Sequence, residues 1–243
     1  MSSKIIYHRG DENNAPANTI LAFEQAAKGD GDGVELDVQF TRDNELVVFH
    51  DQKIDKHTKS SGYVSDYSLS ELKKIKLETG STKNGEQYIP TLAETLAAVE
   101  NMEIINIELK QRDGDDLEQE EKLVQVLAAR GVEEKTLVTS FNHYTIHNLH
   151  EIAPDMKKGI LYYSRLYRPW DYARQLGADH LIPLHRTVTE KMLSGAHRNG
   201  LKVAAYGTND HDRIEKLIEL GVDMIITDEA EAALSLREEM TGE

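Results

Sequence analysis

Two acidic residues and a histidine stand at spacings that could assemble a hydrolytic site. Glu35 and Asp37 are two residues apart in an apolar segment, so in a β-strand both carboxylates would leave the same face. A polar turn at 41–45 leads to a second apolar segment, 46–50, and a hairpin would return His50 to the neighbourhood of Asp37. Neighbouring carboxylates repel and raise each other's pKa unless a positive charge lies between them. A divalent cation or a phosphate-handling site is the natural reason for such a cluster.

The composition restricts the classes of function. The chain has 243 residues, no cysteine and a formal net charge of −15 at pH 7. Nucleic acids and anionic membranes require a basic face, so the acidity argues against both, although a small phosphate ester could bind in a locally positive pocket. Disulfides, thiolate catalysis and cysteine zinc sites are excluded. No run reaches the ~18 apolar residues of a membrane-spanning helix, and the N-terminus has no apolar signal region, so we expect a cytoplasmic protein without a stable membrane anchor.

The elements that must position these residues alternate regularly. Strands are expected at 5–7, 34–40, 46–50, 103–110, 136–140, 157–163, 179–182, 201–206 and 223–227. Helices are expected after the Asn18-Thr19 cap and at 68–77, 91–99, 117–130, 143–152, 170–176, 189–199, 210–220 and 229–239. About eight βα units in roughly 250 residues predict the α/β class and a closed TIM (β/α)8 barrel, with the hairpin strand as an extra. We therefore expect a single domain, 1–243, in which the polar segment at about 52–88 is a lid or a small insertion after the second strand.

Three carboxylates fall at the ends of the predicted strands, where a barrel has its active site. Glu108 joins Glu35 and Asp37 there. The three offer only hard oxygen ligands, which suits a Ca²⁺, Mg²⁺ or Mn²⁺ ion and argues against zinc.

Basic and imidazole side chains end the same strands. Arg9 and Lys110 are suited to a phosphate, the first as a fork and the second as a point charge. His8 and His50 titrate near neutrality and could act as an acid–base pair. A metal, two cations and two imidazoles together describe the hydrolysis of a phosphodiester.

The chain resembles the glycerophosphodiester phosphodiesterase family in motifs that occur in order along essentially its whole length. These motifs are His8-Arg9-Gly10, Pro16-Ala17-Asn18-Thr19, Glu35-Leu36-Asp37-Val38, His50-Asp51, Ile89-Pro90-Thr91-Leu92, Ile107-Glu108-Leu109-Lys110, Ser140-Phe141 and Gly221-Val222-Asp223-Met224-Ile225-Ile226-Thr227-Asp228. The resemblance implies a distorted TIM barrel with a small insertion after the second strand. It also implies an enzyme of lipid and glycerol metabolism with a small-molecule substrate.

The resemblance further implies a role for each candidate residue. One divalent cation would be bound by Glu35, Asp37 and Glu108. His8 and His50 would be the catalytic acid–base pair, and Arg9, Lys110, Phe141 and Tyr206 would bind the substrate and its phosphate. The implied reaction releases glycerol 3-phosphate and an alcohol, with initial attack by the glycerol 2-hydroxyl and a cyclic phosphate that water then opens.

Two positions depart from the family pattern. Ala17 replaces the usual Glu of Pro-Glu-Asn-Thr, and Tyr206-Gly207-Thr208-Asn209 stands where Trp-Thr-Val-Asn is common. Tyr differs from Trp in area and hydrogen bonding, so the substrate pocket could differ. The rival hypotheses are a related barrel phospholipase acting on lysophospholipids, and a catalytically idle barrel that binds a phosphorylated ligand or a partner. A homodimer through the barrel rim is also possible.

Overall fold

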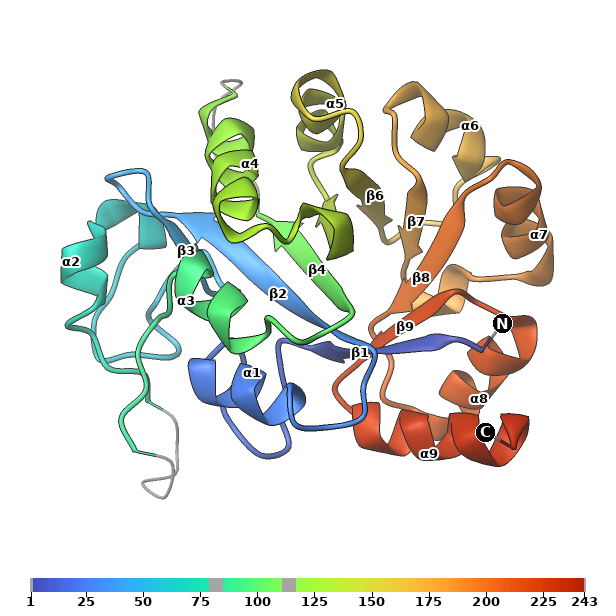
Figure 1. Ribbon diagram of the computed structural model, residues 1–243, viewed down its shortest axis with the longest axis horizontal. Helices are drawn as coiled ribbons and strands as arrows, with labels where there is room; N and C mark the ends of the chain where they lie inside the picture. Colours follow the sequence, from blue (N-terminus) through green and yellow to red (C-terminus); the bar gives the residue numbers. More distant parts are fainter. Residues whose placement is uncertain (1, 79–84, 111–116, 243) are drawn as a thin grey trace.

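A single sheet of nine strands forms the centre of the computed structural model, which describes residues 2–78, 85–110 and 117–242 (Figure 1). The strands are β1 (Lys4–His8), β2 (Gly33–Phe40), β3 (Leu46–Val48), β4 (Ile104–Leu109), β5 (Thr136–Ser140), β6 (Lys157–Tyr162), β7 (His180–Pro183), β8 (Lys202–Tyr206) and β9 (Met224–Thr227). Parallel pairing runs from β1 through β9, β8, β7, β6, β5 and β4 to β2, and β1 also pairs with β2. The eight parallel strands therefore close into a TIM barrel, as the sequence predicts.

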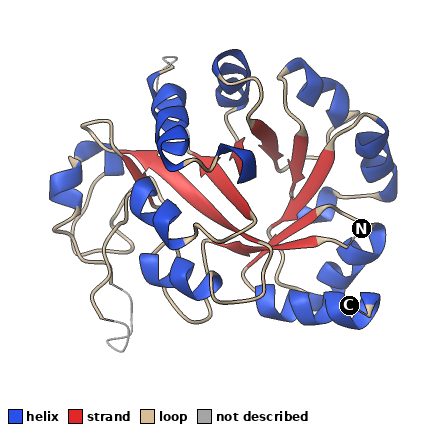
Figure 2. Cartoon of the chain, viewed as in Figure 1, coloured by secondary structure: helices blue, strands red, loops and turns tan. Residues whose placement is uncertain are grey.

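Helices surround this barrel (Figure 2). They are α1 (Ile20–Ala26), α2 (Leu69–Leu72), α3 (Leu92–Ala98), α4 (Glu118–Arg130), α5 (His143–Ile152), α6 (Pro169–Gln175), α7 (Glu190–Arg198), α8 (His211–Leu220) and α9 (Ala230–Thr241). Short 3₁₀ turns lie at η1 (Val64–Asp66), η3 (Glu133–Lys135) and η4 (His185–Thr187). The last helix, α9, packs against the first strand, β1, so the two ends of the chain meet.

Side chains on the two faces of each strand form two separate cores. One apolar cluster fills the barrel interior with one or two residues from most of the strands: Ile6, Leu137, Leu161, Ile182, Ala204, Met224 and Ile226. A larger cluster lies between the strands and the helices and contains their sequence neighbours, such as Tyr7 and Tyr162. Because the side-chain period of a strand is two, His8 shares the inward face with Ile6. The strand ends therefore point their polar residues into the mouth of the barrel.

The extra strand β3 pairs antiparallel with β2, with Val38 opposite Val48 and Phe40 opposite Leu46. This is the predicted hairpin, but its second strand ends at Val48 rather than at 50. The chain still follows β2 for one more residue, since Phe49 N donates to the carbonyl oxygen of Asp37 at 2.9 Å. His50 thus comes next to the middle of β2, near Asp37, without being in a strand.

The segment after the hairpin has an apolar core of its own. Val47, Phe49 and Ile89 from its borders pack with Ile54, Val64 and Leu72 from within. The predicted helix at 68–77 was too long, because α2 covers only Leu69–Leu72. Ser68 caps it through the amide of Glu71, and after Lys73 the backbone turns extended and forms the isolated bridge of Lys76 to Tyr88. Residues 79–84 of the predicted insertion lie outside the described residues.

Candidate active site

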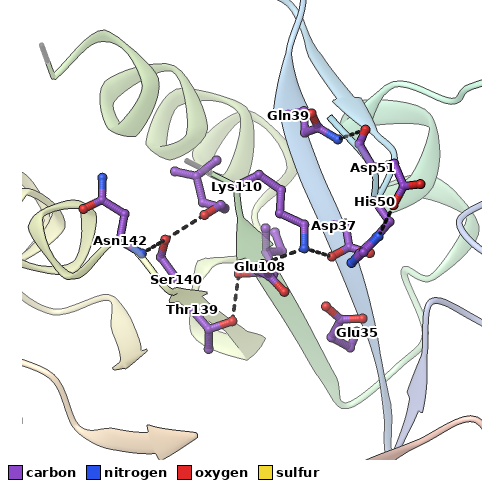
Figure 3. Close-up of polar contacts among 12 residues, drawn as sticks. Glu35, Asp37, Gln39, His50, Asp51, Glu108, Lys110, Thr139, Ser140 and Asn142 are labelled. Carbon is purple, nitrogen blue, oxygen red and sulfur yellow. Dashed lines mark hydrogen bonds and ion pairs between the residues drawn. The ribbon is translucent and has the colours of Figure 1, made fainter. Parts of the chain in front are cut away.

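Three carboxylates meet near the end of β4 and beside the middle of its neighbour, the hairpin strand β2. The parallel register places Asp37 beside Glu108, and Glu35 is two residues earlier on the same face of β2. One oxygen from each of the three lies within 4.8 Å of the others. Figure 3 shows these side chains converging from two strands on a common space. The spacing noted in the sequence therefore does bring the acidic residues together.

Asp37 is fully buried and strongly paired. Its carboxylate oxygens lie 2.9 Å from Arg9 Nε and 2.7 Å from Lys110 Nζ, and Asn18 Nδ2 donates to it at 2.8 Å. Burial alone would raise the pKa of Asp37, but the charges of Lys110, Arg9 and His50 outweigh it and lower the pKa to about 2. Asp37 is therefore a permanent negative charge at neutral pH.

Glu35 is the opposite case within the same cluster. Only 4% of the residue is exposed, and its Oε2 accepts no hydrogen bond from any described residue. Burial, followed by the charge of Asp37, raises the pKa of Glu35 to about 8. Glu108 is also shifted upward in pKa, by burial and then by Asp37, although Lys110 Nζ lies 2.6 Å from it.

This combination fits a divalent cation. A buried carboxylate oxygen without a partner costs free energy, and an ion bound by oxygen ligands would remove that cost. Glu35, Asp37 and Glu108 supply the oxygens, and the sequence contains no cysteine. The donor set thus matches Ca²⁺, Mg²⁺ or Mn²⁺ in chemistry.

Two histidines flank the carboxylates, and each is held by an aspartate. His8 Nδ1 is 2.5 Å from Asp228 Oδ1, and its Nε2 is 3.8 Å from Glu35 Oε2. His50 Nδ1 is 2.7 Å from Asp51 Oδ1. Pinning Nδ1 of an imidazole sets the ring orientation and leaves Nε2 for proton exchange.

The two imidazoles differ in proton affinity. Burial alone would lower the pKa of His8, but the hydrogen bond with Asp228 and the charge of Glu35 raise it. Burial lowers the pKa of His50, and the nearby Asp37 only partly opposes this effect. His8 therefore holds its proton more strongly than His50 does.

The turn that carries Arg9 depends on unusual backbone conformations. Arg9 has φ 59° and Gly10 has φ 87°, a region that glycine enters readily. A Cβ on Gly10 would lie 2.8 Å from Ala22, so α1 also requires glycine here. The Arg9 backbone is tied down by Arg9 N to Glu35 O and by Asn18 N to Arg9 O, both at 2.9 Å. The His-Arg-Gly motif thereby presents two side chains to the site from one tight turn.

Several polar residues of the site carried no role in the sequence analysis. Asn18 was interpreted as part of a helix cap, whereas Thr19 makes the cap and Asn18 binds Asp37. Asn209 donates to Asp228 Oδ2 at 2.7 Å and so supports the aspartate that holds His8. Their signal was weak but present, because Asn18 lies in the second motif and Asp228 ends the last one.

The remaining predicted substrate residues form an aromatic group at the mouth of the barrel. Phe141 and Tyr206 meet edge to face with ring centroids 6.1 Å apart. Tyr163 stacks on Phe141 at 4.4 Å and completes the group. Burial, followed by the neighbouring Tyr163, raises the pKa of Tyr206. The structure thus brings Phe141 and Tyr206 together on the side of the mouth away from β1.

Comparisons with known proteins agree with this geometry. The sequence model of the glycerophosphoryl diester phosphodiesterase family matches residues 8–232. A glycerophosphodiester phosphodiesterase of Caldanaerobacter subterraneus subsp. tengcongensis is 37% identical over 241 residues, covering 97% of this chain and 98% of that protein. One from Bacillus altitudinis is 34% identical over 243 residues, with 98% and 99% covered.

Solved structures give the same result. A phosphodiesterase of Oleispira antarctica, solved with the product sn-glycerol-3-phosphate, superimposes with a TM-score of 0.90 at 25% identity, covering 97% of this chain and 96% of that one. None of the helices in the described part of the chain is long and apolar enough to cross a membrane.

Proposed function

The chain belongs to the glycerophosphoryl diester phosphodiesterase family and is an enzyme of that class, and from this premise we propose that it works with one divalent cation and a pair of histidines. The substrate is a glycerophosphodiester, and the products are glycerol 3-phosphate and an alcohol. The observation that carries the proposal is the buried oxygen of Glu35, which accepts no hydrogen bond from the described residues, in a carboxylate cluster flanked by two imidazoles.

Glu35, Asp37 and Glu108 would hold the cation. Ca²⁺ and Mg²⁺ are the first candidates and Mn²⁺ the third, because all three prefer oxygen ligands. When bound, the cation supplies an orienting charge for the substrate oxygens and lowers the pKa of the attacking hydroxyl.

Arg9 and Lys110 would bind the phosphate with the donors that their ion pairs leave free. Arg9 uses Nε for Asp37, so its terminal nitrogens remain for phosphate oxygens. Lys110 Nζ donates to Glu108 and forms an ion pair with Asp37, and its three N–H groups are not all used by these contacts. The carboxylates thus fix both cations without using up their donors.

His50 would act as the base and His8 as the acid in the first step. The lowered pKa of His50 keeps its ring neutral, ready to take the proton of the glycerol 2-hydroxyl. The hydrogen bond with Asp228 and the charge of Glu35 raise the pKa of His8, which favours the proton-bearing ring that an acid needs. His8 then gives its proton to the leaving alcohol oxygen.

The reaction would therefore run in two steps that balance in protons. The 2-hydroxyl oxygen forms a bond to phosphorus as the bond to the alcohol oxygen breaks, which yields a cyclic phosphate and the alcohol. Water then attacks the cyclic phosphate, with the proton moves of the two histidines reversed. Phe141 and Tyr206 would cover the substrate from the far side of the mouth.

The direct test is release of glycerol 3-phosphate from a panel of glycerophosphodiesters that differ in the leaving alcohol. We expect turnover that chelator abolishes and that Ca²⁺, Mg²⁺ or Mn²⁺ restores. His8→Ala and His50→Ala should each lower kcat by about 10²–10⁴-fold. His147→Ala is the matched control, since this histidine is exposed on α5.

Two outcomes would contradict the proposal. Full turnover by either histidine variant would rule out the proposed acid–base roles. Full turnover in chelator would rule out the need for a cation. We also propose a cytoplasmic location, supported by the sequence composition; fractionation of the source cells would test it.

A further inference from the structure

A cavity of about 260 Å³ lies outside the barrel, lined by the end of β6, the loop into α6 and the start of α7. Tyr162 forms part of this lining and belongs to the outer core, whereas its neighbour Leu161 belongs to the barrel interior. Successive side chains of a strand point to opposite faces. The cavity is therefore on the other side of β6 from the carboxylates and histidines, and the proposed function leaves it unused.

The lining of this cavity is basic in an otherwise acidic chain. Arg165, Arg168 and Lys191 contribute to it, and no aspartate or glutamate does. Arg168 is paired with Asp171 at 2.7 Å, but no ion-pair partner for Arg165 or Lys191 is found in the described part of the chain. A local concentration of positive charge on a molecule of net charge −15 favours an anionic ligand.

One residue of the lining carries a buried hydroxyl group. Tyr162 is 6% exposed, and its hydroxyl has no hydrogen-bond partner within the described residues. Burial raises its pKa, so the hydroxyl keeps its proton and is a donor. Buried polar groups without partners are uncommon in folded proteins, and a ligand oxygen would satisfy this one.

Part of the remaining lining is apolar, and the indole in it has a fitted place. Trp170 and Met192 contribute to the lining. Gly195 on α7 leaves room for the indole, because a Cβ there would lie 2.2 Å from the Trp170 ring. The cavity thus combines a fixed apolar surface with a few polar donors, which is the usual build of a small-molecule site.

We propose that this cavity is a second binding site, for a small organic anion with an oxyanion head and a short apolar body. The head oxygens would accept a hydrogen bond from Tyr162 and pair with Arg165 and Lys191. The body would pack against Trp170 and Met192. This inference does not rest on the proposed function.

The chain offers a probe confined to this site, because Trp170 is its single tryptophan. We would titrate the protein with n-butyl phosphate and follow tryptophan fluorescence, with inorganic phosphate and n-butanol as separate ligands. A phosphate that binds Arg9 and Lys110 has no indole beside it to report. We expect a saturable change with butyl phosphate, and binding about tenfold weaker or worse for the other two, which each lack half of the ligand.

Two variants assign the signal to named groups. Tyr162→Phe keeps the ring and removes the hydroxyl, and should weaken butyl phosphate binding about fivefold. Arg165→Gln changes an exposed residue, so the fold should persist while affinity falls. Glycerol 3-phosphate release measured without butyl phosphate should be unchanged in both. A missing saturable signal, equal affinity for butanol, or unchanged affinity in both variants would each overturn the proposal.

Discussion

The two ends of the barrel treat partly or fully buried acidic side chains in opposite ways. Just before the strand, Asp32 accepts hydrogen bonds from Lys4 Nζ at 2.9 Å, Arg237 Nη1 at 2.6 Å and the amide of Ile5 at 2.8 Å. These partners outweigh burial and lower the pKa of Asp32. Within the strand, Glu35 has an oxygen without a hydrogen-bond partner in the described chain, and its pKa is raised.

The difference teaches how charge is divided between stability and function in this barrel. Lys4 is in β1, Asp32 precedes β2 and Arg237 is in α9, so the satisfied cluster joins the first and last elements of the fold. The charged groups of this cluster already have partners within the protein. The cluster at the other end is left incomplete by the protein itself, and is therefore the one able to bind a ligand.

The largest effect on activity should come from replacing Glu35, whose Oε2 accepts no hydrogen bond from the described residues. Glu35→Gln should lower kcat/KM by about 10³-fold, because it removes a ligand of the proposed cation. In chelator the same variant should unfold at a temperature equal to or above that of the parent, since a neutral amide costs less to bury than a carboxylate. Activity assays and thermal unfolding check both parts. If Glu35→Gln lowered the unfolding temperature and kept full activity, Glu35 would serve stability and not function, which would contradict this prediction.

A smaller loss of activity should follow from the aspartate that holds His8. Asp228→Asn keeps the shape but removes the charge, so the pKa of His8 should fall and kcat should drop by about 10–100-fold. An acid must be protonated, so the pH–rate profile should lose activity at a lower pH than in the parent. Asp212→Asn, an exposed site on α8, is the control. An unshifted profile would contradict the positioning role.

At the satisfied end, the expected effect is on stability alone. Asp32→Asn should lower the free energy of unfolding by about 1–3 kcal/mol, because it leaves Lys4 and Arg237 without a partly buried partner. Urea unfolding measures this, and kcat should stay within about twofold of the parent. A large fall in kcat would show that the two ends are not independent.

The smallest effect concerns pH, where the two ends should respond in opposite directions. Asp32 has a lowered pKa, so its contribution is present above about pH 4 and is lost as pH falls through that lowered value. Glu35 has a folded-state pKa of about 8, so in chelator its penalty grows as pH rises from about 4.3 to 8. The difference in unfolding free energy between the parent and each variant, measured against pH, should change by on the order of 1 kcal/mol or more. If this difference did not change with pH for either variant, the shifted pKa values of Asp32 and Glu35 would be contradicted.

Much of the site could be predicted because it follows the period of a strand. Glu35, Asp37 and Glu108 share an inward face as soon as β2 and β4 are paired, and the hairpin explains His50. The barrel itself follows from the alternation of strands and helices. The two-residue period of a strand and the alternation of strands and helices can each be recognised from a short stretch of sequence.

The parts that were missed depend on contacts between distant segments. Asp228 and Asn209 acquire meaning only when β9 closes against β1, and no local pattern marks them as partners of His8. The expected helix at 68–77 was too long because bridges to neighbouring segments override helix propensity after Lys73. The sequence also cannot show which nitrogen of Arg9 pairs with Asp37, because this depends on the tertiary structure.

The pair of His8 and Asp228 also has a consequence for how the molecule is made. The two residues are 220 positions apart in the chain, and they meet only when the last strand docks on the first. During synthesis on the ribosome, a nascent chain that lacks β9 already contains the three proposed cation ligands, but it has no partner for this histidine. Contacts of such long separation form late and slowly, since the entropy of a long loop must first be lost. A truncated translation product should therefore be catalytically silent, and the cell would meet a working enzyme only after the whole barrel has emerged.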